Sequence, residues 1–213
     1  MWIFGYGSLL WYTNFPVEKR VVGRLKGYVR RFWQKSPDHR GTHELPGRTV
    51  TIIPYPEGEV LGIAYLVPEK DVASVREYLD YREKAGYELQ RAHFVPEPGE
   101  STTPFDLNVY ISPQHDNEWY AGEENIDDIA NVVVQAVGPS GSNIEYVLKV
   151  AASLRTLSGL RPEPESGSGQ RLQSTGDPHV DAVEQNVLRL CWERNITDKC
   201  LTELGHHQLE LSD

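Results

Sequence analysis

Short runs of β-branched and aromatic residues, broken by turns rich in Gly and Pro, fill the first two thirds of the chain. Such runs are typical of β-strands. Because most of the links between them are of hairpin length, we expect a mostly antiparallel sheet that curls into a barrel. The expected strands are 2–4, 21–32, 49–53, 60–67, 88–95 and 105–111, with turns at 54–58 and 96–99.

The last third of the chain follows a helical period instead. Apolar residues spaced three and four apart predict helices over 125–137 and 142–157, and Ser142 with Glu145 forms a capping box at the start of the second. A further helix begins at Asp177 and Pro178, which suit an N-cap and a first helical position. The pattern therefore indicates an α+β fold, with helices flanking the barrel and a helical C-terminal third.

Residues 158–176 are rich in Pro, Gly and Ser, a composition typical of a mobile linker. We therefore expect three parts: a catalytic or binding domain over 1–157, a flexible linker over 158–176, and a C-terminal helix and tail over 177–213. The last part is expected to be a dispensable appendage.

One helix is expected inside the strand-rich part, from about residue 69 to residue 85. At about 100° per residue, Val72 and Leu79 lie on one apolar stripe, and Glu83 falls at the centre of that stripe. A buried carboxylate is costly unless it is paired or used, and burial would raise its pKa toward the range of a general base. Glu83 is therefore a candidate base. The alternatives are that Glu83 sits just past the last packed turn of the helix, or that a basic neighbour such as Arg82 or Lys84, or the basic zone of residues 18–48, neutralises it.

The N-terminal strand runs directly into a Gly-Tyr-Gly-Ser turn, in the string IFGYGSLL at residues 3–10. Two glycines flanking a tyrosine let the backbone turn sharply and expose successive N–H groups. This geometry suits an anion or a developing oxyanion. It is not a dinucleotide fingerprint, because the third glycine of that motif is missing.

Composition narrows the class of protein. A chain of 213 residues with 39% hydrophobic content can bury a substantial core, and its net charge of −10 disfavours nucleic-acid binding. The chain has no apolar run near the ~20 residues that span a bilayer, and its apolar start suits a buried strand better than a signal peptide. Its two cysteines, Cys191 and Cys200, argue against a disulfide scaffold and fit the cytosol.

The charge is uneven along the chain. Between Glu18 and Arg48 the chain has nine Lys and Arg residues but only three acidic residues. Such a basic zone on an acidic protein suits a small anionic ligand. The alternative is an ordinary solvated strand surface.

Other catalytic arrangements fit the sequence poorly. Ser8, His39 and Asp38 could form a hydrolase triad, but the Gly-x-Ser-x-Gly elbow is missing. His43 and Glu44 lack the second His of a zinc-protease motif, and a metal site at 206–207 in the polar tail is improbable. We expect neither a metal nor a catalytic cysteine.

Several separated strings resemble those of a known family. They are WIFGYGSLLW (2–11), RRFWQKSPDHRG (30–41), PGRTVTI (46–52), GIAYLVP (62–68), YLDYREKAGY (78–87) and GPSGSNIEYVL (138–148). Together, and in this order, they resemble the ChaC family of glutathione-specific γ-glutamylcyclotransferases, most closely its shorter, non-stress-induced members. The resemblance covers about residues 1–157.

The resemblance implies a compact β-barrel with flanking helices, a cytosolic location, no cofactor, and conversion of glutathione to 5-oxoproline and Cys-Gly. The family's catalytic glutamate falls on Glu83. Ala85 stands where Gly is common in the family. The implied substrate-binding residues are Ile3, Phe4, Gly5, Tyr6, Gly7, Ser8, Leu9, Arg30, Arg31, Asp38, Arg40 and Tyr146.

Two further functions remain as alternatives. The same fold could act on other γ-glutamyl dipeptides or amines, because no residue pattern shows what reads the Cys-Gly half of the substrate. The chain could also be a non-catalytic protein that binds a partner. We expect no nucleic-acid or membrane partner, and a monomer is favoured.

Overall fold

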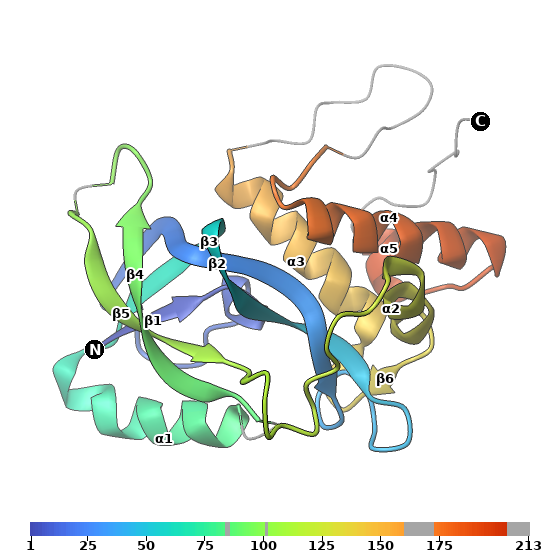
Figure 1. Ribbon diagram of the computed structural model, residues 1–213, viewed down its shortest axis with the longest axis horizontal. Helices are drawn as coiled ribbons and strands as arrows, with labels where there is room; N and C mark the ends of the chain where they lie inside the picture. The colour runs from blue at the N-terminus through green and yellow to red at the C-terminus, as the bar shows by residue number, and fades with distance from the viewer. Residues whose placement is uncertain (84–85, 101, 160–172, 204–213) are drawn as a thin grey trace. The chain divides into compact units, whose positions relative to one another are not determined.

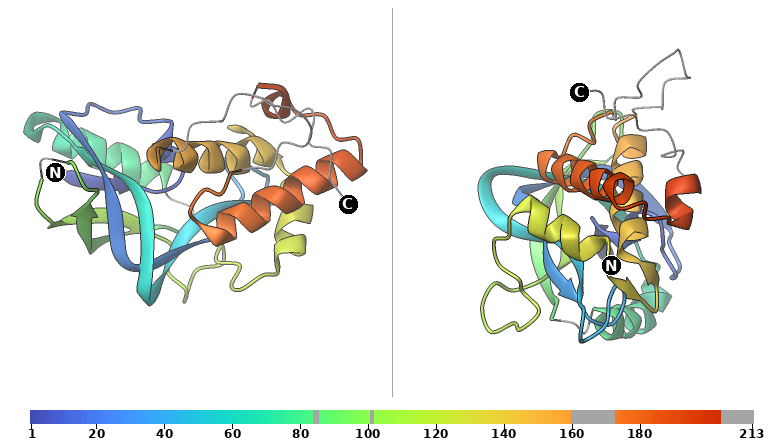
Figure 2. Two further views of the ribbon diagram at one scale, coloured as in Figure 1. Left: turned by 90° about the horizontal axis from the view of Figure 1, so that it is seen from above. Right: turned by 90° about the vertical axis from the view of Figure 1, so that its right-hand side faces the viewer.

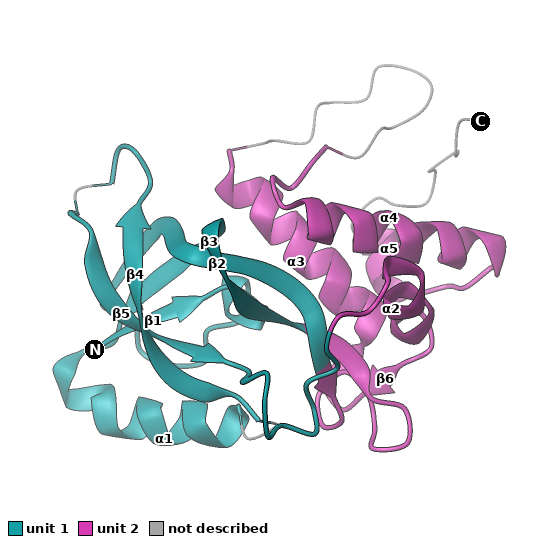
Figure 3. Cartoon of the chain, in the orientation of Figure 1, with its two compact units in different colours: residues 1–34, 50–122 teal, residues 35–49, 123–213 magenta. Residues whose placement is uncertain are grey.

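The computed structural model describes residues 1–83, 86–100, 102–159 and 173–203 (Figure 1). The chain forms two compact units, of which unit 1 comprises Met1–Gln34 and Val50–Gly122, and unit 2 comprises Lys35–Thr49 and Glu123–Asp213 (Figure 3). The units interleave in sequence because two long strands each run from one unit into the other. The expected division into a domain, a linker and a C-terminal part at residues 157 and 176 stays a prediction.

Unit 1 contains a closed barrel, as the sequence predicts. The strand order is β1-β3-β2-β4-β5. β1 pairs antiparallel with β3, β4 pairs antiparallel with β2 and with β5, and β1 closes the barrel by a parallel pairing with β5. The strands are β1 (Trp2–Gly5), β2 (Lys19–Ser36), β3 (Gly47–Leu66), β4 (Glu88–Pro96) and β5 (Phe105–Ile111).

The expected turn at 54–58 is wrong, because β3 passes through it without a break. The side chains of Pro54 to Glu57 are exposed, so the two prolines occupy positions where a missing N–H donor is tolerated. Gly58 then approaches β2 so closely that a Cβ there would lie 2.4 Å from the carbonyl oxygen of Tyr28. The Gly and Pro residues therefore shape a long strand and do not end it.

A helix packs against the barrel of unit 1 (Figure 1). It begins as the short 3₁₀ turn η2 (Glu69–Asp71) and continues as α1 (Val72–Arg82). Val75 and Leu79 are buried in one cluster with Ile3 and Tyr65. The apolar stripe that the sequence predicts is thus the buried face of α1, and Glu83 directly follows the helix as its C-cap.

Unit 2 is mostly helical. The helix α4 packs on α2 and α3 (Figure 2). The apolar stripe of α4 is buried. The capping role of Ser142 is confirmed, since its side chain accepts a hydrogen bond from the Glu145 N–H. The helix expected over 125–137 is shorter than predicted, since α2 covers only Ile126–Val133.

The sequence patterns do not predict β6, β7 or α5. The elements of unit 2 are α2 (Ile126–Val133), β6 (Val137–Gly138), β7 (Gly141–Ser142), α3 (Asn143–Leu157), α4 (Pro178–Glu193) and α5 (Lys199–Glu203).

Most of the expected linker, and the His pair at 206–207, lie outside the described residues. The four residues 173–176 are described, and Thr175 is buried. Arg155 of α3 donates a 2.6 Å hydrogen bond from Nε to the carbonyl of Gln173. In the part of the chain that the structure describes, no helix is long and apolar enough to cross a membrane.

Candidate active site

The glycine turn folds over the end of β1. Residues Ser8–Leu10 form a 3₁₀ turn, η1, in which the Leu10 N–H donates to the carbonyl of Gly7 at 2.9 Å. Gly5 allows this close return of the chain, because a Cβ there would lie 2.8 Å from Cβ of Leu9 and 2.9 Å from the ring of Tyr65. No larger residue fits at position 5 without moving the loop.

Two buried side chains hold the backbone of the turn. Arg30, only 1% exposed, donates from Nε to the carbonyl of Tyr6 at 3.0 Å and from Nη2 to the carbonyl of Leu61 at 2.6 Å. The Tyr65 hydroxyl donates to the carbonyl of Leu9 at 2.6 Å. These bonds orient the peptide groups of the turn from beneath.

Tyr6 continues this network into β5 and α1. Its hydroxyl donates to the carbonyl of Tyr110 at 2.7 Å, and the Tyr110 hydroxyl donates to Oδ1 of Asp80 at 2.5 Å. Burial, the hydrogen bond to Asp80, and the negative charges of Asp80 and Glu83 raise the pKa of Tyr110. Tyr110 is therefore a neutral hydrogen-bond donor at neutral pH.

Glu83 stands at the point where α1 ends. Its N–H donates to the carbonyl of Leu79 at 2.8 Å, and its own carbonyl accepts from the Tyr87 N–H at 3.1 Å. Its side chain is 20% exposed. Oε1 lies 3.5 Å from Nε of Arg82, whose Nη2 donates to Ser8 Oγ at 2.7 Å. Unit 1 therefore brings together the candidate base and the Tyr6–Leu9 turn.

A polar network fastens the segment that begins at Gly86. Asn117 Nδ2 donates to the carbonyl of Gly86 at 3.2 Å and to Oγ of Ser112 at 2.8 Å. Ser112, which is buried, in turn donates to Oε1 of Gln34 at 2.5 Å. These bonds tie the segment from Gly86 onward to the wall of the barrel.

The other candidates of unit 1 have packing roles. Ile3 and Phe4 are buried strand residues, so only their backbone could face a ligand. The guanidinium of Arg31 lies 5.7 Å from the ring centroid of Trp33 and donates to the carbonyl of Arg30. Arg30 is buried and binds the backbone of the Tyr6–Leu9 turn at the carbonyl of Tyr6.

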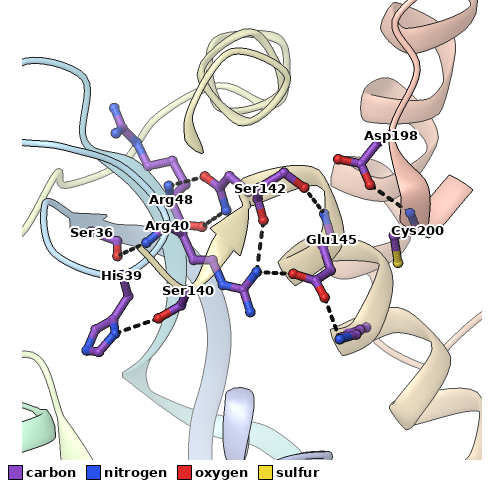
Figure 4. A network of polar contacts seen from close by, with 11 residues as sticks. Ser36, His39, Arg40, Arg48, Ser140, Ser142, Glu145, Asp198 and Cys200 are labelled. Atoms are coloured by element: carbon purple, nitrogen blue, oxygen red, sulfur yellow. Dashed lines mark hydrogen bonds and ion pairs between the residues drawn. The ribbon is translucent and has the colours of Figure 1, made fainter. Parts of the chain in front are cut away.

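Unit 2 brings together two further candidates, Arg40 and Tyr146. Arg40 lies within a polar network with Ser142 and Glu145 (Figure 4). Nη1 of Arg40 donates to Oε2 of Glu145 at 2.5 Å and to the carbonyl of Ser142 at 3.0 Å, with the guanidinium 5.7 Å from the Tyr146 ring centroid. Burial opposes ionisation of Glu145, but hydrogen bonds from Lys149 and Arg40 outweigh it and lower the pKa of Glu145. The geometry gives Arg40 a structural ion pair.

Asp38, also in unit 2, has one buried carboxylate oxygen, Oδ1, without a hydrogen-bond partner in the described part of the chain. Its neighbour His39 pairs through Nδ1 with Oγ of Ser140 at 3.1 Å (Figure 4). Ser8, the nucleophile of the alternative triad, instead accepts a hydrogen bond from Arg82. Nothing in these contacts favours a hydrolase.

Several site residues were not singled out from the sequence. The sequence marks Arg82 only as a charge that could neutralise Glu83, and no pattern points to Tyr65 or Tyr110. The position of Arg82 next to Glu83 is the one sequence signal for its role. Tyr65 and Tyr110 are distant in sequence from the residues that they contact, so no local pattern marks them. Among the described residues, no group of three His, Cys, Asp or Glu side chains could hold a metal ion.

Comparison with known proteins decides the family. The family described as "ChaC-like protein" matches residues 1–165. The chain belongs to the ChaC-like family. The resemblance on which the sequence analysis relied is thereby confirmed.

Individual ChaC-like relatives are similar over most of their length. A Danio rerio protein named glutathione-specific gamma-glutamylcyclotransferase 1 is 35% identical over 190 residues, covering 88% of this chain and 89% of the relative. An Arabidopsis thaliana protein named gamma-glutamylcyclotransferase 2-3 is 40% identical over 161 residues, covering 74% and 81%. The crystal structure of a glutathione-specific γ-glutamylcyclotransferase from yeast has a TM-score of 0.75 and 28% identity, covering 89% of this chain and 96% of that one.

Proposed function

We propose that this chain is a glutathione-specific γ-glutamylcyclotransferase, which converts glutathione to 5-oxoproline and Cys-Gly. The observation that carries the proposal is the junction of the Glu83 carboxylate with the Tyr6–Leu9 turn through Arg82. The names of the ChaC-like relatives from zebrafish and yeasts support glutathione as the substrate.

The reaction needs a base and a site for developing negative charge. The α-amine of the glutamyl group attacks its own γ-carbonyl carbon, forming the C–N bond of a five-membered lactam. Because the attack is intramolecular, the enzyme has mainly to fold the glutamyl chain and hold it. No water is consumed and no cofactor is expected.

Glu83 handles the proton in this proposal. Its carboxylate takes a proton from the attacking α-amine, and the resulting carboxylic acid passes it to the departing nitrogen of Cys-Gly as the amide bond breaks. The base is thus regenerated in each turnover. The Glu83 side chain is 20% exposed, so it is partly shielded from water but still accessible to a substrate.

The turn provides for the negative charge on the γ-carbonyl oxygen. The first N–H groups of a helical turn have no intrahelical partner, and Ser8 and Leu9 begin η1. Removing one oxyanion donor from another enzyme costs about 3–4 kcal/mol of transition-state stabilisation, which sets the scale for such a group. Of the remaining candidates, Arg31, Asp38, Arg40 and Tyr146 stay proposals for contacts with the substrate, as do the backbone of residues 3–9 and the side chain of Ser8.

The cytosol is the expected compartment. Both cysteines are free and buried, and burial first of all raises the pKa of each thiol to about 11. Such thiols are unreactive and compatible with a reducing compartment. They also carry no part of the proposed chemistry.

The proposal is tested with purified protein and a panel of γ-glutamyl compounds. Glutathione, γ-Glu-Ala and γ-Glu-ε-Lys are incubated in parallel, and 5-oxoproline and the released amine are quantified. We expect product from glutathione alone. Product only from another compound would keep the fold and change the substrate, and no product from any would favour a partner-binding protein. Complete loss of activity in Ser8→Ala would favour a nucleophilic serine.

A further inference from the structure

One guanidinium, that of Arg82, connects the carboxylate of Glu83 with the hydroxyl of Ser8. Its Nε lies 3.5 Å from Oε1 of Glu83, and its Nη2 donates a 2.7 Å hydrogen bond to Ser8 Oγ. We propose that Arg82 is a positioning residue of the cyclisation: it keeps Glu83 ionised and oriented, and it fixes the Ser8 end of the turn. This inference rests on the proposed function.

The planar fork of an arginine explains why one side chain can do this. Besides its contacts to Glu83 and Ser8, Arg82 donates from Nη1 to the hydroxyl of Tyr78 at 3.3 Å. Its three nitrogens therefore each meet a different oxygen. The ammonium of a lysine is a point charge on a flexible stem and cannot reproduce this set of directions.

The position of Arg82 is itself constrained. The ring of Tyr12 lies against the guanidinium, 5.6 Å from its Cζ to the ring centroid. Tyr12 also donates its N–H to the carbonyl of Ser8 at 3.0 Å, so Arg82 contacts both Ser8 and a residue that is hydrogen-bonded to Ser8. The Arg82 side chain is 13% exposed, and its ion pair with Glu83 is less screened by salt than a surface pair.

The charges around Glu83 make the positive charge of Arg82 important. From the described residues of α1, Asp80 contributes a second carboxylate, paired with Arg76 at 3.8 Å. From β5, Tyr110 contributes a hydroxyl that donates to Asp80, and the negative charge of Glu83 helps to raise the pKa of this hydroxyl. A nearby cation favours an ionised carboxylate, whereas a nearby anion disfavours it. Without Arg82, Glu83 would be protonated at a higher pH and lose its role as a base there.

The test separates the charge of Arg82 from its shape. The full chain is prepared as wild type, Arg82→Met and Arg82→Lys, and kcat/KM for glutathione is measured across pH. Arg24→Met is the matched control, because Arg24 also pairs through Nε with a glutamate, Glu97 at 2.5 Å, and lies outside the proposed machinery. Circular dichroism establishes that each variant is folded.

In Arg82→Met we expect kcat/KM to fall about 10²-fold, as for a misplaced catalytic group. We expect the acidic limb of its kcat/KM–pH profile, where activity falls as Glu83 is protonated, to move up by about one pH unit. In Arg82→Lys the limb should move less, while kcat falls about tenfold because the fork is lost. Arg24→Met should match wild type in both respects.

An acidic limb in its wild-type position in folded Arg82→Met would overturn the proposal. If Arg82→Met does not fold, wild-type kinetics in Arg82→Lys would overturn it instead. Titration of the Glu83 carboxyl carbon by ¹³C NMR tests the role of Arg82 without any turnover. The two proposals can therefore fail separately. Absence of 5-oxoproline from the wild type would contradict the proposed function alone, whereas an unchanged Glu83 titration in Arg82→Met would contradict the role of Arg82.

Discussion

Nε of Arg30 donates a 3.0 Å hydrogen bond to the backbone carbonyl of Tyr6 from within the buried interior of unit 1. The same guanidinium binds the carbonyl of Leu61 on β3. An arginine that is part of a substrate-binding motif in the sequence thus supports the turn from below. The turn is held by the barrel and does not depend on substrate for its shape.

Arg30→Met should destabilise the protein by about 2–4 kcal/mol, because two buried carbonyls lose a charged donor. Chemical denaturation measures this loss. Arg31→Met is the control, since Arg31 is only partly buried and stacks on Trp33; it should change the free energy of unfolding by about 0.5 kcal/mol or less. Equal losses in both variants would contradict a supporting role for Arg30.

Gly86→Ala should lower both stability and turnover. Gly86 has a φ of +91°, and a Cβ there would lie 2.4 Å from Oδ1 of Asn117, so either Gly86 or the Asn117 side chain that donates to its carbonyl must shift. Gly99 is a matched control, because it has a φ of +98° but a Cβ added there would meet no atom within 4 Å. Both variants should lose about 1 kcal/mol of stability through backbone strain, while only Gly86→Ala should lose kcat. Full kcat in Gly86→Ala would show that the segment that begins at Gly86 does not position Glu83.

The ion pairs of Glu145 predict a pH dependence of stability. Because its folded pKa is lowered below the ordinary 4.5, Glu145 stabilises the fold above that value, and this contribution is lost as the pH falls through the folded pKa. The difference in free energy of unfolding between wild type and Glu145→Gln should therefore be largest near neutral pH and shrink below about pH 5. Glu203→Gln is the control for loss of one carboxylate from an exposed ion pair, that with Lys199, and should cost at most about 0.5 kcal/mol at neutral pH.

Truncation after Leu157 should prevent stable folding of unit 2, in contrast to the dispensable appendage that the sequence suggested. Val180, Val183 and Val187 of α4 are fully buried, and each contributes about 1.5–3 kcal/mol by burial. Glu184 of α4 also pairs with Arg155 of α3, at 2.9 Å from Oε1 to Nη1. Loss of this helix approaches the whole stability of a typical domain.

A pair of substitutions on α4 checks the same point without truncation. Val187→Ala should cost about 2 kcal/mol, whereas Trp192→Ala, at a position with an exposed side chain, should cost little. A truncated chain that unfolds cooperatively at the wild-type midpoint would contradict this account of α4.

The barrel and the main helices could be predicted because their signals are local. Runs of β-branched and aromatic residues marked the strands, and the stripe from Val72 to Leu79 marked the buried face of α1. The path of β3 through 54–58 could not be predicted, because exposed prolines within a strand and prolines in a turn look alike in sequence.

The candidate site could be predicted only in part for a similar reason. Glu83 and the glycine turn carry local signals, in helix phase and in glycine spacing. The bonds from Arg30 to Tyr6 and from Tyr65 to Leu9 join residues 24 and 56 positions apart, and no periodicity reveals them. The packing of α4 on α3 is likewise a tertiary contact across residues 158–176.

The most direct measurement compares Glu83→Gln with Glu77→Gln for 5-oxoproline release from glutathione. Glu77 is an exposed carboxylate on the same helix, so it controls for the loss of one charge from α1. Both variants should fold as wild type does. Glu83→Gln should lose at least about 10²-fold in kcat, as for removal of a general base, and Glu77→Gln should keep full turnover. Substantial turnover in folded Glu83→Gln would contradict the account.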